Sequence, residues 1–203
     1  MIKVLLNCSG FFMPYSKEHK EKTRKVILKS AFKLFTAKGF DGVTVNEIMK
    51  NCGLTRGGFY AHFSSKASLY SESIKFAATT RKLEELKPKN FSDKRWLSLL
   101  LDKYLSVEHV NGARPCPLTF LVTDIITRNA EAKSAYARTY ADMNSVLMKY
   151  ASSYSNCNKH EILSLTAMII GAVAISRTMD NKKSVKKLLA SCRHEVGMKL
   201  GGI

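Results

Sequence analysis

The sequence predicts an all-helical protein with a short basic N-terminal unit and a longer C-terminal unit. Apolar residues recur every three or four positions along most of the 203 residues, which is the spacing of amphipathic helices. No stretch shows the strict alternation of a strand, and no repeat of fixed period is present. The segment KPKNFSD at residues 87–93 places a proline between two helical patterns. We therefore expect two helical units that meet near this segment, with about nine helices in all.

The first helix is expected over residues 17–38, where Ile27, Ala31 and Leu34 form an apolar stripe beneath a lysine-rich outer face. Gly39 can adopt the left-handed backbone that ends helices, and Asp41-Gly42 forms a turn that leads to Thr44. The residues before this helix are expected to be a disordered extension. Met13 is a plausible alternative start, since the apolar N-terminus lacks the cleavage site of a signal peptide.

Residues 44–66, TVNEIMKNCGLTRGGFYAHFSSK, predict two short helices joined by a tight turn. Thr44 and Glu47 have capping-box spacing, which begins the first of them. Gly53 ends that helix, and Thr55 is a plausible cap for a second helix from Arg56 to Phe63. A helix, a turn with glycine and a second helix form the helix-turn-helix pattern, whose second helix enters the major groove of DNA.

The rest of the chain predicts six further helices, each with an apolar face or core. The stretch LSLTAMIIGAVAIS is apolar almost all round, which indicates burial on two sides. The expected ranges are Lys66–Leu86, Asp93–His109, Leu118–Thr127, Ala130–Ser153, Lys159–Met179 and Ser184–Lys199. The corresponding domains are an extension at 1–16, a DNA-binding domain at 17–66, a connecting helix at 67–87 and a helical domain at 88–203.

The net charge and the cysteines indicate which kind of binding partner and which cellular compartment to expect. With 33 Lys+Arg against 16 Asp+Glu, the net charge of +17 favours a polyanionic partner such as DNA or an anionic membrane surface. The five cysteines show neither a CxxC pair nor metal-ligand spacing, so we expect free thiols in a reducing compartment, and neither metal nor cofactor. After the N-terminus we expect no segment long and apolar enough to span a bilayer.

The run from Lys25 to Leu69 resembles the DNA-binding domain of the TetR family of transcriptional regulators. The resemblance lies in ILKSAFKLFTAKGF, TVNEI and CGLTRGGFYAHFSSK, in that order and spacing, over about a quarter of the chain. It implies a cytoplasmic homodimer, most often a repressor. Each subunit would place one recognition helix in a major groove of a pseudo-palindromic operator, and a small ligand or chemical signal would release the DNA.

The resemblance also implies roles for individual residues, and the physical chemistry of each agrees. Arg56 can donate two hydrogen bonds to a guanine, while Gly57 and Gly58 allow close backbone approach to base edges. The residues that the resemblance assigns to phosphate contacts are Thr44, Thr55, Tyr60, His62 and Lys66. Phe59 and Phe63 are expected in the core. Lysines 17, 20, 22, 25 and 29 either solvate the first helix or touch the DNA backbone.

Two sensing sites are open from the sequence. Cys116 lies between two prolines with Arg114 nearby, and a neighbouring cation favours the reactive thiolate of an oxidant or electrophile sensor. The segment RPCPLTFL resembles the Gly-Cys-Pro segment of some TetR-type regulators, although Cys116 as a buried packing residue is the alternative. The other site is an apolar cavity lined by Trp96, Leu100, Tyr104, Phe120, Tyr136, Tyr140 and Met143.

The dimer interface is expected on the last two helices, because a face of small residues lets helices approach closely. The residues expected there are Met168, Gly171, Ala172, Ile175, Leu188 and Leu189. Two other functions are alternatives. A thiol-dependent enzyme would use Cys116 with His109 or His160, but no motif surrounds them. A basic membrane-surface protein would use the apolar N-terminus as an anchor.

Overall fold

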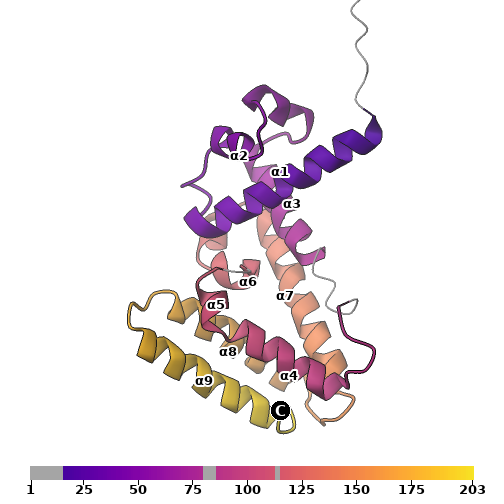
Figure 1. Cartoon of the computed structure of the whole chain (residues 1–203), viewed down its shortest axis with the longest axis vertical. Coiled ribbons are helices and arrows are strands. Elements are labelled where there is room, and N and C mark those ends of the chain that lie inside the picture. Colours follow the sequence, from indigo (N-terminus) through magenta and orange to yellow (C-terminus); the bar gives the residue numbers. More distant parts are fainter. Residues whose placement is uncertain (1–15, 80–85, 113–114) are drawn as a thin grey trace, which may run out of the picture.

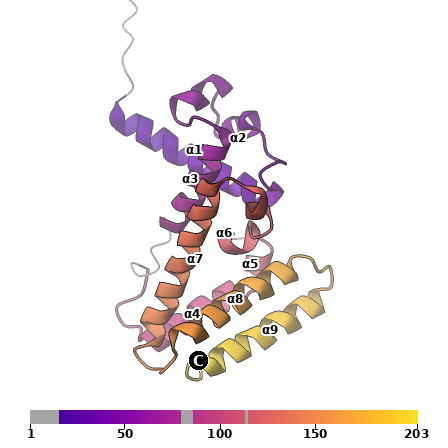
Figure 2. The same ribbon diagram turned by 180° about the vertical axis from the view of Figure 1, so that it is seen from behind.

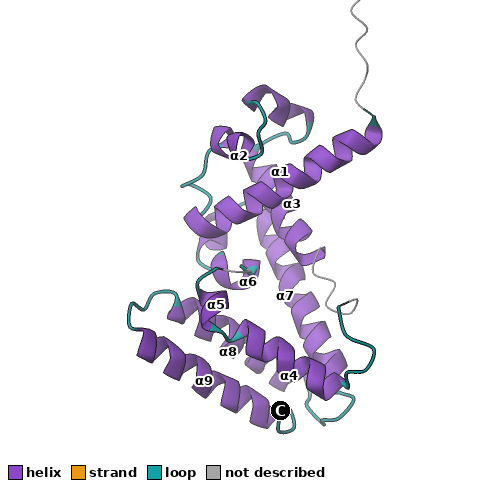
Figure 3. Ribbon diagram, in the orientation of Figure 1, coloured by secondary structure: helices purple, strands orange, loops and turns teal. Residues whose placement is uncertain are grey.

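The computed structural model describes residues 16–79, 86–112 and 115–203, and within these ranges it contains helices and loops but no strand (Figure 3). The predicted all-helical fold is confirmed. The predicted extension lies outside the described residues except for Ser16. The elements are α1 (Lys17–Lys38), α2 (Val45–Asn51), the 3₁₀ helix η1 (Arg56–Ala61), α3 (Lys66–Thr79), α4 (Asp93–Tyr104), α5 (Val107–Val110), α6 (Pro117–Phe120), the 3₁₀ helix η2 (Asp124–Thr127), α7 (Ala130–Ala151), α8 (Lys159–Ser176) and α9 (Lys182–Lys199).

The helices form a head and a body joined by one long helix. Figure 1 shows α1, α2 and α3 together at one end of the molecule, and α4, α8 and α9 at the other. Helix α7 runs from the head to the far end of the body, which the view from behind in Figure 2 also shows. The short helices α5 and α6 lie between head and body. The C-terminus lies at the end farthest from the head.

Polar caps and glycines set the helix ends where the sequence predicts several of them. The side chain of Thr44 accepts a hydrogen bond from the backbone N–H of Glu47, and Asn158 with Glu161 forms a complete capping box at α8. Gly39 and Gly53 have φ values of 72° and 69°, so each takes the left-handed conformation that stops a helix. These ends are therefore encoded locally.

Two predicted helices are wrong because each is broken in the structure. The helix expected over 93–109 ends at Tyr104, and Ser106 caps the separate helix α5 by accepting a hydrogen bond of 3.1 Å from the N–H of His109. The helix expected over 118–127 is divided into α6 and η2. The predicted end of the connecting helix at Leu86 cannot be compared, since residues 80–85 lie outside the described ranges.

The head and the body are packed together rather than merely linked. The main core of the head is formed by Ile27, Phe35, Ile48 and other buried residues of α1, α2, η1 and α3. The same cluster contains four residues from the end of α6, from η2 and from the start of α7: Leu121, Ile125, Ala132 and Ala135. The body has its own core between α4, α7, α8 and α9. The head core thus extends across the sequence boundary expected at residues 87–93.

A polar cluster joins the same elements, and we call it the Asp124 junction: Asp124, Tyr70, Arg128, Asp41 and the backbone of Phe40. The carboxylate of Asp124 accepts hydrogen bonds from the Phe40 N–H at 3.1 Å and the Tyr70 hydroxyl at 2.6 Å. Arg128 donates to both carboxylate oxygens of Asp41, at 2.9 and 3.3 Å. Burial, followed by the Asp124 carboxylate, raises the pKa of Tyr70 well above its usual range, so the phenol stays a donor.

The sequence analysis expects no helix after the N-terminus that is long and apolar enough to span a bilayer, and α8 corrects this expectation. Within the described part of the chain it is the one helix long and apolar enough to cross a bilayer by length and composition, with a mean hydropathy of 1.3. Of this helix, 44% is buried inside the fold, and the core helices of globular proteins meet the same criterion. The apolar composition of α8 is accounted for by its place in the body core.

Candidate nucleic-acid interface and sensing site

The helix-turn-helix is formed by α2, a tight turn and η1. The N–H of Leu54 donates to the carbonyl of Met49 at 2.9 Å, which closes the turn behind α2. The capping box predicted at Thr44 is only half formed, because the carboxylate of Glu47 pairs with Lys38 at 2.5 Å instead of returning to the Thr44 N–H. That ion pair holds the start of α2 against the end of α1.

The second helix differs from the prediction, since residues 56–61 form a 3₁₀ helix rather than a longer α-helix. Gly57 and Gly58, near its start, lower the stability of a regular α-helix there. Phe59 and Phe63 are buried as predicted, with their ring centroids 5.9 Å apart. They fix the inner side of η1 to the head core.

Arg24 is a positioning residue that the sequence analysis missed. Its guanidinium lies 4.2 Å from the centroid of the Phe63 ring, donates to the carbonyl of His62 and pairs with Glu72 of α3. These contacts tie the end of η1 to both α1 and α3. The partners lie 38 and 48 residues away, so no local sequence pattern reveals them.

The outer side of η1 exposes the residues that the family resemblance assigned to DNA. Thr55, Arg56 and Gly57 are exposed, and the Tyr60 side chain is 62% exposed. Among the described residues, Arg56 has neither an ion pair nor a hydrogen bond to its guanidinium. Thr44, which caps α2, is exposed as well. Each of these residues is therefore accessible to a partner, and Arg56 places a cation at the start of η1.

The glycines of η1 are not required by the fold of the free protein. Neither Gly57 nor Gly58 has a positive φ value. A Cβ added at Gly57 would meet nothing within 4 Å, and one at Gly58 would make only ordinary contacts of 3.8 Å or longer with Met49 and Thr55. The missing side chains leave the backbone open to something that approaches from outside.

His62 and Lys66 are less free than expected for phosphate ligands. Burial of His62, aided by Lys20 and Arg24, lowers the pKa of its imidazole, which therefore is neutral at physiological pH in the free protein. The ammonium of Lys66 donates to the carbonyls of Phe40 and Val43, both at 2.9 Å, and lies 4.1 Å from the Phe40 ring. Two of the three N–H groups of Lys66 therefore bind the head itself, and one is left for the predicted phosphate contact.

Most of the expected sensing residues form one cluster around Cys116, which is 7% exposed. The Tyr104 hydroxyl shares a hydrogen bond of 2.7 Å with Thr119, and the Tyr136 hydroxyl donates to the Leu118 carbonyl at 2.6 Å. Tyr140 reaches the Leu163 carbonyl at 3.4 Å. Burial raises the pKa of Tyr136 to about 12. The cluster is therefore a set of hydrogen-bonded tyrosines around a buried thiol.

Trp96, Leu100 and Phe120 do not share this place, so the predicted single cavity is wrong. Trp96 is 6% exposed and belongs to the body core, with Leu100 packed against that core. Phe120 instead faces a cleft between head and body, where the guanidinium of Arg177 lies 3.7 Å from its ring centroid.

The expected dimer residues also divide into two groups. Ala172 and Leu189 are 5% and 3% exposed and belong to the core of the monomer, which corrects their assignment to an interface. Met168 and Ile175 are 38% and 51% exposed on one side of α8. Gly171 lies between them, and an added Cβ there would meet nothing within 4 Å. Leu188 is partly exposed on α9.

The histidines weighed for an enzyme have different surroundings. His109 is buried, with its Nδ1 atom 2.6 Å from the carbonyl of Tyr104, whereas His160 is exposed at the start of α8. The described residues contain no group of three or more His, Cys, Asp or Glu side chains that could hold a metal ion.

Comparison with known proteins identifies the head. Residues 27–72 match the family model described as "Bacterial regulatory proteins, tetR family". Residues 27–72 therefore form a DNA-binding head of the TetR type. An uncharacterized HTH-type transcriptional regulator of Bacillus subtilis, YdgC, is 36% identical over 91 residues, which are 44% of this chain and 40% of YdgC. The negative regulator IcaR of the Staphylococcus aureus biofilm operon icaADBC is 41% identical over 49 residues, 24% of this chain and 26% of IcaR.

The sequence matches thus span less than half the length of these curated relatives. The fold match extends further. Reduced NemR of Escherichia coli superposes with a TM-score of 0.74 over 86% of this chain and 95% of NemR, at 16% identity. This likeness confirms the predicted architecture of a helix-turn-helix head on a helical body. Both curated relatives, YdgC and IcaR, are named as transcriptional regulators.

Proposed function

We propose that this protein is a dimeric transcriptional repressor of the TetR family that binds a pseudo-palindromic operator and releases it when a small ligand binds. In this proposal, η1 enters the major groove, where Arg56 contacts a base edge and Thr44, Thr55, Tyr60 and His62 contact phosphates. The net charge of +17 supports a polyanionic partner. A repressor of this kind works in the cytoplasm, where the five cysteines would remain reduced.

The observation that carries the proposal is the pair of glycines in η1, of which Gly57 is exposed and Gly58 is partly exposed. Glycine lowers the stability of a helix interior, so it is a poor choice where nothing requires it. Neither left-handed backbone nor crowding requires it here. Close approach of an external surface to the backbone accounts for both glycines, and the exposed Arg56 beside them matches the chemistry of a guanine edge.

Gly57→Ala tests this explanation because it should move stability and DNA affinity in opposite directions. The free energy of unfolding is expected to stay the same or rise by up to about 1 kcal/mol, since the added methyl restricts the unfolded chain and meets no neighbour. The affinity for operator DNA should fall by about 1–3 kcal/mol per half-site, the scale of a lost base contact.

The measurement is a gel shift on the DNA just upstream of the protein's own gene, with urea unfolding of the same samples. A random duplex of equal length is the control for non-specific affinity. Unchanged operator affinity in a stably folded Gly57→Ala protein would show that η1 does not lie against the base pairs.

A face of α8 supports the dimer. Met168, Gly171 and Ile175 lie three and four positions apart, so they share one side of the helix. The absence of a side chain at Gly171 leaves room for a second helix backbone, and the exposed apolar side chains would be buried by a twofold copy of α8.

The state of Cys116 favours a ligand over an oxidant as the releasing signal. A redox sensor needs an accessible thiolate, but this thiol is 7% exposed and enclosed by tyrosines. We expect hydrogen peroxide to change operator affinity by less than about twofold. Cys116→Ser should lower the free energy of unfolding by about 1–3 kcal/mol, because it buries a hydroxyl.

Gel shifts with and without peroxide, and thermal unfolding of both proteins, check this expectation. Peroxide-driven release that disappears in Cys116→Ser would establish the thiol as the sensor and exclude a purely structural role.

A further inference from the structure

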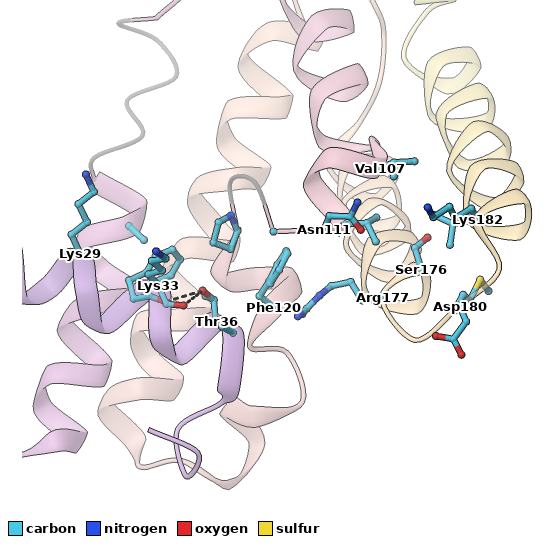
Figure 4. Close-up of a pocket in the computed structure, with 18 of the residues that line it drawn as sticks. Lys29, Lys33, Thr36, Val107, Asn111, Phe120, Ser176, Arg177, Asp180 and Lys182 are labelled. Atoms are coloured by element: carbon cyan, nitrogen blue, oxygen red, sulfur yellow. Dashed lines mark hydrogen bonds between the residues drawn. The ribbon is translucent and has the colours of Figure 1, made fainter. Parts of the chain in front are cut away.

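A large cleft separates the head from the body, and it is not the cavity expected from the sequence. Its volume is about 1090 Å³, and α1 and α3 line it on one side. On the other side are α5, the loop before α6, and the turn between α8 and α9. In Figure 4, Lys29, Lys33 and Thr36 project from α1, while Ser176, Asp180 and Lys182 lie across from them. Phe120 and Arg177 meet between the two sides.

The cleft carries an excess of positive charge from both sides. Lys29 and Lys33 come from α1, and Arg177 and Lys182 come from the end of α8 and the start of α9. Asp180 is the single carboxylate among the lining residues. Within the described ranges, none of the four cations forms an ion pair. Four positive groups and one negative group leave a charge of about +3 to be neutralised, which favours an anion in the cleft.

The floor between these charges is apolar. Phe32, Phe76, Phe120, Val107 and Val110 all line the cleft. The guanidinium of Arg177 stacks 3.7 Å above the Phe120 ring, so its outer edge remains available to a carboxylate, sulfonate or phosphate. Charged groups around an apolar floor suit a molecule with an anionic head and an apolar body.

Ser176 gives an independent sign of a ligand. It lines the cleft and is 1% exposed, yet its hydroxyl has no hydrogen-bond partner. A buried hydroxyl without a partner costs free energy, and most such groups in folded proteins are satisfied. The adjacent residue in the chain is Arg177. A bound anion that accepts from both residues would satisfy the hydroxyl and neutralise the guanidinium.

We propose that this cleft binds an organic anion with an apolar body, held by Arg177, Ser176, Lys33 and Lys29. Resting on the proposed repressor function, the anion is the releasing ligand, because it connects α1 of the head to the α8–α9 turn of the body. A ligand that contacts both sides favours one spacing between them over others, and it thereby changes how the head meets DNA. The volume fits a drug-sized molecule.

The test uses the full chain with anilinonaphthalene sulfonate as the fluorescent anionic probe. Octanoate is expected to displace the probe, whereas octanol, which has the same chain length but is neutral, is not. Arg177→Gln should weaken octanoate binding by about tenfold or more, since a charged hydrogen bond is lost. Lys187→Gln removes an exposed lysine of α9 outside the cleft and should leave binding unchanged.

Ser176→Ala separates a binding role from a structural one. Because the hydroxyl has no partner in the free protein, its removal should leave thermal stability equal or higher, while octanoate binding weakens by about fivefold to tenfold. Equal displacement by octanol, or unchanged octanoate binding in both Arg177→Gln and Ser176→Ala, would overturn the site.

Operator binding is measured separately. Octanoate that binds in the cleft and lowers operator affinity supports the full proposal, and octanoate that binds without changing operator affinity overturns its role as the releasing ligand. A chain that binds octanoate with the predicted dependence on Arg177 but binds no DNA would contradict the repressor function and leave the anion site standing.

Discussion

Asp124→Ala is expected to lower the free energy of unfolding by about 3 kcal/mol, because it leaves several buried groups without partners. The Tyr70 hydroxyl, on a residue 1% exposed, loses its acceptor at 2.6 Å. The Phe40 N–H loses its acceptor at 3.1 Å, and Arg128 loses one of its two carboxylate neighbours. Since the head and the body share this junction, we expect both to unfold in one transition.

The decrease in the free energy of unfolding is measured by urea unfolding, with circular dichroism as the signal. Asp142→Ala is the matched control, since Asp142 is exposed on α7, and it should change stability by less than about 0.5 kcal/mol. Asp124→Asn should fall between the wild type and Asp124→Ala, because an amide keeps one acceptor but loses the charge. A stability of Asp124→Ala equal to that of the control would mean that the junction does not stabilise the fold.

Arg56→Ala is expected to weaken operator binding by about 1–3 kcal/mol per half-site and to relax the preference at one base position. The free protein should keep its stability, since Arg56 is exposed and its guanidinium forms neither an ion pair nor a hydrogen bond within the described residues. Tyr60→Phe provides a contrast. It removes a hydroxyl that would contact a phosphate, so affinity for operator and random DNA should fall by similar factors.

Both variants are measured by fluorescence anisotropy against an operator set in which one base pair at a time is changed. Lys187→Ala, on α9 of the body, is the control for a change of charge alone. An Arg56→Ala protein with wild-type operator affinity and an unchanged base preference would show that Arg56 does not contact the bases.

Features that depend on neighbouring residues were predictable from the sequence. The first helix begins and ends as expected, Thr44 caps α2, and Gly39 and Gly53 stop helices through left-handed backbone. The burial of Phe59 and Phe63 follows from their spacing. In these places the determining contact lies within a few residues, so the sequence pattern and the structure carry the same information.

Features that depend on distant contacts were not predictable. Lys66 resembles a phosphate ligand, but its ammonium donates to the carbonyls of Val43 and Phe40, which lie 23 and 26 residues earlier in the chain. Helix period alone could not tell that Ala172 faces the monomer core while Gly171 faces out, since the interior of α8 is apolar almost all round. The cleft was missed because its cations come from α1 and from the α8–α9 turn, which only the tertiary fold brings together.

The shared core has a consequence for recombination of regulators. Because Leu121, Ile125, Ala132 and Ala135 complete the head, a hybrid cut in the loop at residues 87–93 would pair the head with a foreign η2 and α7. Asp124 and Arg128 would be lost at the same cut. A modular exchange of DNA specificity therefore has to transfer two separate pieces of this gene, the codons for the head and those for residues 121–135.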